Sequence, residues 1–394
     1  MTGIAEAPVR VGQRLLARTA VGGRPPALDR AALVEMLREA GLTGRGGAGF
    51  PVWRKLAAVG GRPIVIANGA EGEPASGKDR ALLAYQPNLV LDGLQIVVGA
   101  LGASAAHVYL PAAAGGAIRA ALAARRGAGL DPVAVTVHAA PDTFVAGEES
   151  AVAAAVSGRP ALPTDKRIRI TESGVDGAPT LVQNVETLAH IAMIARHGPA
   201  WFRTAGTPAE PGTFLATVGG AVAAPGVVEA GYGVPLGELI DAAGGATAEL
   251  RAVLVGGYHG GWIPAHPDLP ISRAALAPFG ASPGAGVVLA LPVGVCGLTE
   301  TARITGYLAG QVSGQCGPCI NGLPRLADTL SDLAHRRARP GLPAEVERLS
   351  ALVTGRGACR HPDGTVRMIR SAMHAFEADV AAHLAGRCLA REGF

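Results

Sequence analysis

Short apolar runs alternate with longer helical stretches through the first half of this chain. The run at 64–67 suits a strand buried on both faces, and further strands are expected at 106–110 and 133–138. Helices are expected between them, at 88–101 and 113–125. This alternation predicts a parallel α/β sheet with right-handed crossovers. Other helices of this part are expected at 30–40, from Pro51 to about 58, at 148–156 and at 185–197.

The pattern changes after Pro211. Short strands at 213–218, 226–230 and 252–255, with a helix at 236–243, predict a small β-grasp-like module. From residue 299 the chain becomes helical and predicts an antiparallel four-helix bundle. Its expected helices are 299–311, 324–336, 343–352 and 365–384. The predicted domains are an N-terminal arm (1–30), a Rossmann-like α/β domain (31–210), the β-grasp module (211–292) and the bundle (293–394).

Composition limits the class of protein. A chain of 394 residues with 49% apolar and 17% charged residues can form two to four cores. Its five cysteines do not resemble a secreted disulfide framework. No signal-peptide pattern and no apolar run near the ~18 residues of a membrane span is present; the longest runs are Ile96–Ala106 and Gly286–Leu298. We therefore expect a soluble, cytoplasmic protein without a membrane span.

Three cysteines and a serine form the strongest chemical signal. Ser313, Cys316 and Cys319 stand three residues apart and Cys359 follows after a long helical stretch, a spacing typical of iron–sulfur ligands. A buried pair of structural thiols is one alternative. A zinc site is another, with His361 as the nearby fourth ligand.

Bundle geometry separates the remaining two cysteines from this group. If the first helix runs up, Cys316 and Cys319 lie at the top of the bundle. The second helix then descends and the third returns, so Cys359 is expected at the same end. Cys296 precedes the first helix and Cys388 follows the last, so both are expected at the opposite end, about 20 Å away. We expect no metal role for them.

Glycine-rich and polar segments mark a second site. Residues 44–49 open a helix, where backbone N–H groups can face a phosphate. Residues 68–74 follow the first buried strand, and ligands of parallel α/β domains lie at the carboxyl ends of strands. Glu148 and Glu149 begin one helix, where first-turn capping is the ordinary alternative, and Gln183 and Asn184 precede another.

Together these segments identify a family. GRGGAGFPxxxK, NxxEGEP…KDR, GEE and QNVETLAH occur in this order, and they resemble the flavin- and NADH-binding subunit of respiratory complex I and of related hydrogenases and formate dehydrogenases. The resemblance covers roughly residues 35 to 375. It implies FMN in the α/β domain, a β-grasp module of the SLBB type, and a 4Fe–4S cluster, or its 3Fe–4S form, in the bundle. It also implies hydride transfer from NADH to FMN and single-electron transfer to the cluster.

The resemblance also implies residue roles. Catalytic roles fall to Glu71 and Glu73, and cluster ligation to Cys316, Cys319, Cys359 and Ser313. Cofactor binding falls to Gly44, Arg45, Gly46, Gly47, Phe50, Lys55, Asn68, Gly147, Glu148, Glu149, Lys166, Gln183 and Asn184.

Several positions depart from the family pattern. Ala70 replaces an aspartate, Gln183 an asparagine, Phe144 a tyrosine and Ser313 a cluster cysteine. Ala58 and Arg169 replace two phenylalanines that hold the NADH adenine, and each lost ring contact is worth roughly 1 kcal/mol. We therefore expect weakened NADH binding.

Three functions remain open. The first is electron transfer from NADH through FMN and the cluster to a protein partner, which is a ferredoxin or a thioredoxin-like 2Fe–2S subunit, at the periphery of a membrane complex. The second is ferredoxin-coupled transfer without NADH, favoured by 35 basic against 31 acidic residues and by Arg356, Arg360, Arg367 and Arg370 near Cys359. The third is a non-catalytic assembly protein that uses the β-grasp module. Nucleic-acid binding is disfavoured, because aromatic residues are few.

Overall fold

The computed structural model describes residues 8–9, 14–17, 23–165, 167–337, 339 and 341–390. The chain divides into two compact units. One comprises residues 1–216 and 227–234, and the other comprises 217–226 and 235–394. The finer boundaries expected at residues 210 and 292 remain predictions.

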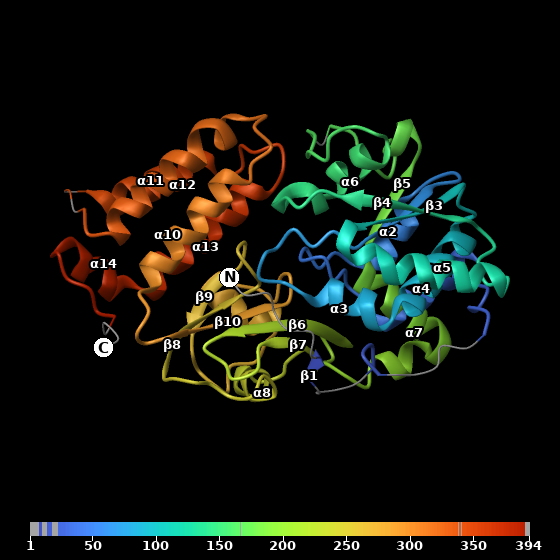
Figure 1. Cartoon of the computed structure of the whole chain (residues 1–394), viewed down its shortest axis with the longest axis horizontal. Helices are drawn as coiled ribbons and strands as arrows, with labels where there is room; N and C mark the ends of the chain where they lie inside the picture. Colours follow the sequence, from blue (N-terminus) through green and yellow to red (C-terminus); the bar gives the residue numbers. More distant parts are fainter. Residues whose placement is uncertain are drawn as a thin grey trace. The chain divides into compact units, whose positions relative to one another are not determined.

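A four-stranded parallel sheet forms the centre of the first unit (Figure 1). Its order is β4-β3-β2-β5, with the bounds β2 Ile64–Asn68, β3 Ala105–Pro111, β4 Val135–Ala140 and β5 Thr180–Asn184. The sequence predicted the first three strands but missed β5. The register places Asn68 beside both Tyr109 and Asn184, so the carboxyl ends of β2 and β5 are neighbours.

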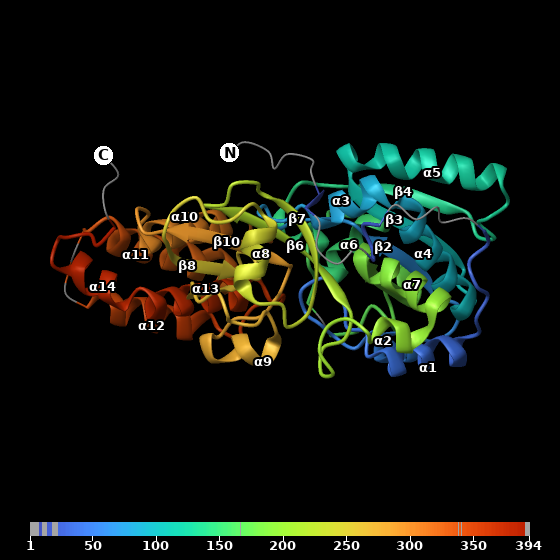
Figure 2. The same ribbon diagram turned by 90° about the horizontal axis from the view of Figure 1, so that it is seen from below.

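The two faces of this sheet bury alternate residues of β2. Val65 and Ala67 belong to a large core with α4 (Pro87–Leu101) and α7 (Val185–Phe202), whereas Ile66 packs in a smaller core with residues of α6 (Glu149–Val156). A strand covered on both faces needs such a continuous apolar run. Figure 2 shows α1 close to α7, which it contacts. The other helices of the unit are α1 Arg30–Ala40, α2 Val52–Ala58, α3 Lys78–Tyr85, α5 Gly115–Gly127, and the short turns η1 Ala112–Ala114, η2 Phe144–Gly147 and η3 Val175–Gly177.

A second sheet follows along the chain, with the strand order β1-β7-β6-β10-β8-β9. β10 runs parallel to β6 and antiparallel to β8. The bounds are β1 Pro8–Val9, β6 Thr213–Gly220, β7 Gly226–Gly231, β8 Leu250–Val255, β9 Gly261–Pro264 and β10 Val287–Pro292, with helices α8 Leu236–Ala242, α9 Arg273–Leu276 and η4 Ala277–Phe279. β9 and β10 were not predicted as strands.

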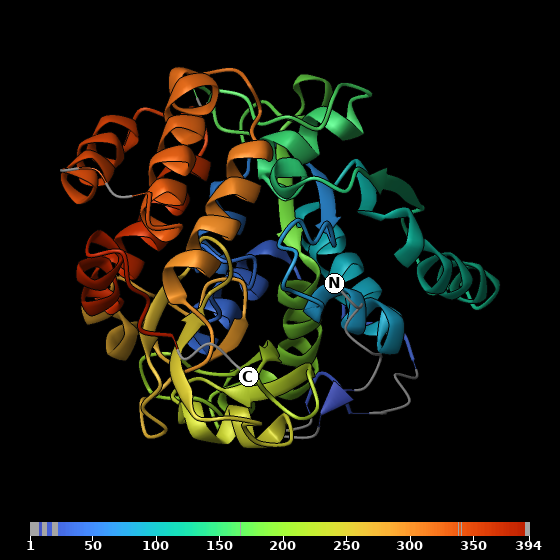
Figure 3. The same ribbon diagram turned by 60° about the vertical axis from the view of Figure 1, so that its left-hand side comes forward.

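The C-terminal region consists of helices that lie side by side, in orange and red in Figure 3. They are α10 Gly297–Gly310, η5 Pro318–Gly322, α11 Leu323–Ala334, α12 Leu342–Val353, α13 His361–Ala375 and α14 Glu377–Leu384. The predicted single helix at 365–384 is wrong, because the chain breaks at Phe376 (φ −114°, ψ 32°). The Phe376 ring is buried beside Gly297 and stacks edge-on against Trp262, which anchors the break.

The predicted combination of a parallel α/β domain, a further sheet and C-terminal helices is confirmed. Among the described residues, no single helix has the length and apolar character needed to cross a membrane. The bent pair of α3 and α4 meets those two criteria only when its helices are taken together.

Candidate active site

The glycine-rich loop is a closed turn ahead of α2. Thr43 and Pro51 form an isolated antiparallel bridge, and the Gly44 N–H donates to the Phe50 carbonyl at 2.9 Å. Gly47 and Gly49 have φ values of 105° and 63°, which only glycine adopts without strain. A Cβ added at Gly46 would lie 3.5 Å from Cβ of Asn184. The loop therefore presents bare backbone beside the end of β5.

Amide side chains gather where β2 and β5 end. Asn68 donates from Nδ2 to the Gly147 carbonyl at 2.9 Å, and its Oδ1 accepts from the Ala70 N–H at 3.1 Å. Asn184 Oδ1 accepts from the Glu186 N–H at 3.0 Å and so caps α7. Gln183 is 4% exposed, and its Nε2 has no hydrogen-bond partner among the described residues. Buried donors are usually paired in native proteins, and an acceptor on a bound molecule would satisfy this one.

The first predicted catalytic glutamate holds a helix in place. Glu71 Oε1 accepts from the Ser76 hydroxyl at 2.6 Å and from the Asp79 N–H at 3.1 Å, and Oε2 accepts from the Arg80 N–H at 3.3 Å. The N-cap residue of α3 is a glycine, which offers no side-chain acceptor. Glu71 supplies that acceptor from outside the helix. Glu73 lies on the same segment, and its Oε1 accepts from the Ala75 N–H at 3.2 Å.

The segment from 144 to 149 supports the site from a third side. Glu148 is the N-cap of α6 and accepts from the Ser150 N–H at 2.8 Å, so the capping alternative holds for this residue. Glu149 pairs with Lys55 at 3.1 Å, and Lys55 Nζ also donates to the Val182 carbonyl at 2.8 Å. Gly147 lies so close to Ala70 that an added Cβ would stand 2.9 Å from its carbonyl oxygen.

A buried group of charges lies behind these loops, and the sequence patterns assigned no role to most of it. Lys78 bridges Asp79 at 2.7 Å and Glu186 at 2.8 Å. Arg45 Nε lies 3.9 Å from Glu186, and His190 Nε2 lies 3.8 Å from the same carboxylate. The signal was present in the KDR and QNVETLAH motifs, but ordinary patterning places charges on the surface.

The Arg45 side chain is committed to the protein interior. Its guanidinium donates to the Thr43 hydroxyl at 2.8 Å and to the Thr213 carbonyl at 3.0 Å, and it lies 4.7 Å from the centre of the Tyr232 ring. Its backbone N–H donates to the Thr187 hydroxyl at 2.9 Å. The side chain therefore braces the glycine-rich loop from behind.

Burial and pairing set the protonation of this group. Burial raises the pKa of Asp79 to about 6, against the opposing charge of Lys78. Burial also acts to raise the pKa of Glu186, but Lys78, His190 and Arg45 together outweigh it and hold that pKa at about 2. Burial lowers the pKa of His190 to about 4. Near neutral pH the lysine, the arginine and both carboxylates are charged, so the group is close to neutral overall.

The predicted adenine positions lie on the surface. Phe50 is 53% exposed, and Ala58 and Arg169 are exposed as well. The structure thus offers one aromatic ring among the three positions. Lys166, a predicted nicotinamide contact, lies outside the described residues.

The C-terminal ligands converge as predicted. Cys316 Sγ lies 3.6 Å from Cys319 Sγ, and the Ser313 hydroxyl lies 3.9 Å from Cys319 Sγ. Cys359 is buried, and its charge raises the pKa of Cys319, after the larger effects of burial and of Cys316. Burial acts to raise the pKa of Cys316, but N–H donors from Ala358 and Cys319 outweigh it and lower the pKa. Three thiols and one hydroxyl form a donor set that fits an iron–sulfur cluster.

His361, the fourth ligand of the alternative zinc site, is engaged by other groups of the protein. His361 Nε2 donates to the Leu308 carbonyl at 2.8 Å, and its Nδ1 lies 3.1 Å from His259 Nε2. Because a carbonyl only accepts, Nε2 carries the proton, and Nδ1 accepts from His259. Both nitrogens of His361 are therefore used within the protein.

The arginines near Cys359 differ in their pairing. Arg360 pairs with Asp363 at 3.0 Å and Arg370 with Glu347 at 2.6 Å. Arg367 donates to the His259 carbonyl at 3.0 Å, and Arg356 is exposed. The carboxylates offset part of the positive charge that the sequence suggested.

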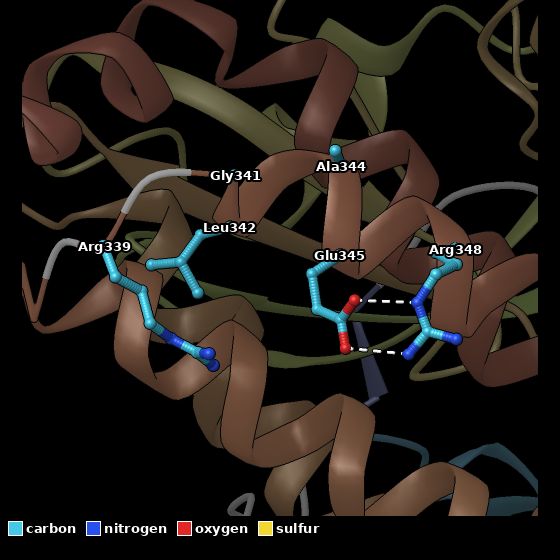
Figure 4. Close-up of a pocket in the computed structure, with 6 residues that line it drawn as sticks. All are labelled: Arg339, Gly341, Leu342, Ala344, Glu345 and Arg348. Carbon is cyan, nitrogen blue, oxygen red and sulfur yellow. Dashed lines mark hydrogen bonds and ion pairs between the residues drawn. The ribbon is translucent and has the colours of Figure 1, made fainter.

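A separate pocket of about 280 Å³ lies at the start of α12 (Figure 4). Arg348 and Glu345 pair there through hydrogen bonds of 2.8 and 2.9 Å. The pocket is lined by Arg339, Gly341, Leu342, Ala344, Glu345 and Arg348. None of these is a predicted site residue.

Comparisons with known proteins agree with this geometry. The sequence model of the Nuo51 FMN-binding domain matches residues 37–193, and that of the NADH-ubiquinone oxidoreductase-F iron-sulfur binding region matches 299–383. The second F-type chain of the NADH-quinone oxidoreductase of Rhizobium meliloti (strain 1021) is 30% identical over 376 residues, covering 90% of this chain and 89% of the relative. The F-type chain of the NADH-quinone oxidoreductase of Escherichia coli (strain K12) is also 30% identical, with 89% and 84% covered.

A solved structure has the same fold. The crystal structure of an NAD+-reducing [NiFe]-hydrogenase in the air-oxidized state superposes with a TM-score of 0.87 and 30% identity, covering 98% of this chain and 70% of that one. Fold, site and comparisons define a flavin- and iron–sulfur-containing oxidoreductase subunit. The chain belongs to the family of NADH-quinone oxidoreductase F subunits. The family predicted from the motifs is confirmed, and with it the FMN-binding domain and the iron–sulfur region.

Proposed function

We propose that this chain passes electrons from a reduced nicotinamide, through FMN at the strand ends of the first unit, to a cluster held by the C-terminal cysteines, and on to a protein partner. Gln183 carries the flavin part of the proposal. Its buried, unpartnered Nε2 belongs to the residue before Asn184, at the carboxyl end of β5 where the glycine-rich loop also lies. A bound FMN would supply the acceptor that this amide lacks among the described residues.

The loop and the strand ends would hold the flavin. When bound, FMN accepts a hydride and gives up its electrons singly. Gly46 and Gly47 allow close approach of backbone N–H groups, and Asn68 and Gln183 offer amide groups. Gly44, Gly147 and Phe50 would form the rest of the FMN site.

The charged residues around the site would hold its loops and helices in place and would not take part in the reaction themselves. Glu71 fixes the start of α3, and Asn184 ties the end of β5 to Asp79. Arg45 and Glu148 act in the same supporting way, from behind the loop and at the start of α6. Glu73 and Lys166 would remain as an acidic and a basic contact for a nicotinamide.

Lys55 and Glu149 form a partly exposed ion pair beside the site. Lys55 Nζ is held between Glu149 and the Val182 carbonyl, one residue before Gln183. A cation fixed at this point would stabilise negative charge that develops on a bound flavin. Glu149 keeps the lysine oriented.

Nicotinamide binding would be weak. Ala58 and Arg169 give the adenine no aromatic stacking, which costs roughly 1 kcal/mol per ring. The alternative, a ferredoxin-coupled protein that no longer uses NADH, rests on the same two residues and on exposed Arg356.

Cys316, Cys319 and Cys359 would ligate three irons of a 4Fe–4S cluster, and Ser313 the fourth. The cluster relays single electrons when bound. The N–H groups of Ala358 and Cys319 favour the Cys316 thiolate, which is the form that binds iron.

The partner would be a small acidic redox protein, either a ferredoxin or a thioredoxin-like 2Fe–2S subunit. Arg356 and Arg367 supply the positive surface beside Cys359. We also propose a cytoplasmic setting, because the cluster thiols must stay reduced.

Cofactor content tests the proposal. Protein purified without air should release FMN on denaturation and contain about four irons and four sulfides per chain. Cys316→Ala should lose iron and keep FMN. A protein that contains neither group, and takes up neither on reconstitution, would contradict the proposal.

A further inference from the structure

Three soft metal ligands meet at the end of the C-terminal helices away from Cys316. They are Cys296, which precedes α10, His383 in α14, and Cys388 beyond α14. Their ligand atoms all lie within 4.8 Å of one another, and Cys296 Sγ is 3.5 Å from His383 Nε2. The sequence patterns predicted no metal role for the two cysteines and gave no signal at His383.

His383 is oriented as a metal ligand would be. Its side chain is 1% exposed, and Nδ1 lies 3.1 Å from the Leu333 carbonyl oxygen. Because a carbonyl only accepts, the ring proton lies on Nδ1. The lone pair of Nε2 then faces the thiols. Metal-bound histidines are held in this way by a backbone carbonyl behind the ring.

The two thiols are free and lie in suitable surroundings. Neither forms a disulfide in the described chain. Cys296 is the N-cap residue of α10, and its side chain caps no N–H, so the thiol is not used by the end of the helix.

Asp379 is a further acceptor on the same helix. It lies one turn before His383 in α14 and is 2% exposed. One of its carboxylate oxygens binds Arg251, while Oδ1 is buried without a hydrogen-bond partner among the described residues. Residues four apart share one face of a helix. Asp379 therefore lies on the face of α14 that carries His383.

We propose that Cys296, His383 and Cys388 form a zinc site separate from the iron–sulfur ligands. Two thiolates and an imidazole are ligands that Zn²⁺ prefers, and water or the Asp379 carboxylate would complete a tetrahedron. α10, of 14 residues or about 21 Å, lies between Cys296 and the Ser313 loop, so one metal cannot serve both sites. The zinc would fasten the chain after α14 to the start of α10.

Metal analysis of the full chain with its cluster tests this site. Protein produced with zinc in the medium and dialysed without chelator should hold about one zinc per chain. Cys388→Ala and His383→Ala should lose the zinc and keep iron and FMN. The matched variant Cys316→Ala should lose iron and keep zinc. X-ray absorption at the zinc edge should show mixed sulfur and nitrogen or oxygen ligands.

Cys388 lies in a loop and is half-buried, so its replacement should leave the fold intact. A wild-type measurement adds a test that needs no variant. Removal of zinc by a chelator should lower the unfolding temperature of wild type and leave that of Cys388→Ala unchanged. Reduced wild type that binds no zinc at micromolar concentration would overturn the proposal, and so would zinc retained by Cys388→Ala. A Cys296–Cys388 disulfide in protein purified without air would do the same.

Discussion

Asn184 donates a hydrogen bond of 2.7 Å from Nδ2 to Oδ2 of Asp79, which joins the end of β5 to the first turn of α3. The same side chain caps α7 through Oδ1. One amide therefore fixes three elements at the edge of the sheet where we place the flavin. Asp79 in turn is held by Lys78, so the site edge and the buried charges form one network.

Asn184→Asp should destabilise the protein in a pH-dependent way. The variant keeps a capping oxygen but places a second carboxylate against Asp79. The pKa of Asp79 is raised by burial from 3.8 to about 6. Its contribution to stability is therefore fully present below pH 3.8 and is lost as pH rises through 6. The added carboxylate increases this loss, so we expect a destabilisation larger by about 1–3 kcal/mol at about pH 8 than at about pH 5.

Chemical denaturation of wild type and variant at both pH values measures this difference. Asn88→Asp, at an exposed position of α4, is the matched control and should show no such dependence. An equal loss for Asn184→Asp at the lower and the higher pH would argue against the carboxylate contact.

Glu186→Gln should be strongly destabilising. Glu186 is 1% exposed and balances Lys78, with Arg45 nearby. Removing one partner of a buried ion pair leaves an uncompensated charge and costs about 3–5 kcal/mol. Thermal unfolding should show a large drop for this variant and none for Glu35→Gln, whose partner Arg38 lies on the surface. A small effect would mean that the buried charges are not coupled.

Gly46→Leu should abolish FMN binding without unfolding the chain. Gly46 has no positive φ, and an added Cβ would make ordinary contact with Asn184, so the backbone tolerates a side chain. The rest of the leucine would occupy space beside the strand ends. Gly60→Leu is the control and should bind FMN normally, because a Cβ added at Gly60 would meet nothing within 4 Å. Fluorescence of the released flavin compares the two variants. A Gly46→Leu protein that still binds FMN would show that the flavin does not lie against this loop.

Ser313→Cys should make the cluster more resistant to air. A serine oxygen is a harder ligand for iron than a thiolate, so the fourth iron of wild type should be labile. We expect air to convert wild type to a 3Fe–4S form faster than the variant, as followed by electron paramagnetic resonance. Ser331→Cys adds a thiol on α11 and should behave as wild type. An identical rate of conversion to the 3Fe–4S form in all three proteins would show that Ser313 is not a cluster ligand.

The sequence predicted the parts of the site that depend on local order. Strand β2 is an apolar run that ends at Asn68, and parallel sheets bind ligands at the carboxyl ends of their strands. The position of Asn68 at this edge of the sheet could therefore be predicted. The interaction of Cys359 with Cys319 could also be predicted, because helix lengths and short loops decide which ends of a bundle coincide.

Features that arise only from tertiary packing were missed. Lys78 and Asp79 begin α3, and charged residues that are buried together give no amphipathic pattern. The break at Phe376 comes from a ring fixed against Gly297 and Trp262, which are distant in the sequence. His383 could be recognised as a possible metal ligand only once the fold showed it close to Cys296 and Cys388.

An anaerobic titration with NADH, followed by reduced ferredoxin, tests the central claim most directly, with flavin absorbance and the paramagnetic resonance of the cluster recorded together. We expect NADH to bleach the flavin only well above micromolar concentration, and a reduced-cluster signal to follow from the same chain. Ferredoxin should then complete the reduction. A flavin that neither donor bleaches, or a flavin that is reduced while the cluster stays oxidised, would contradict electron transfer from flavin to cluster in this protein.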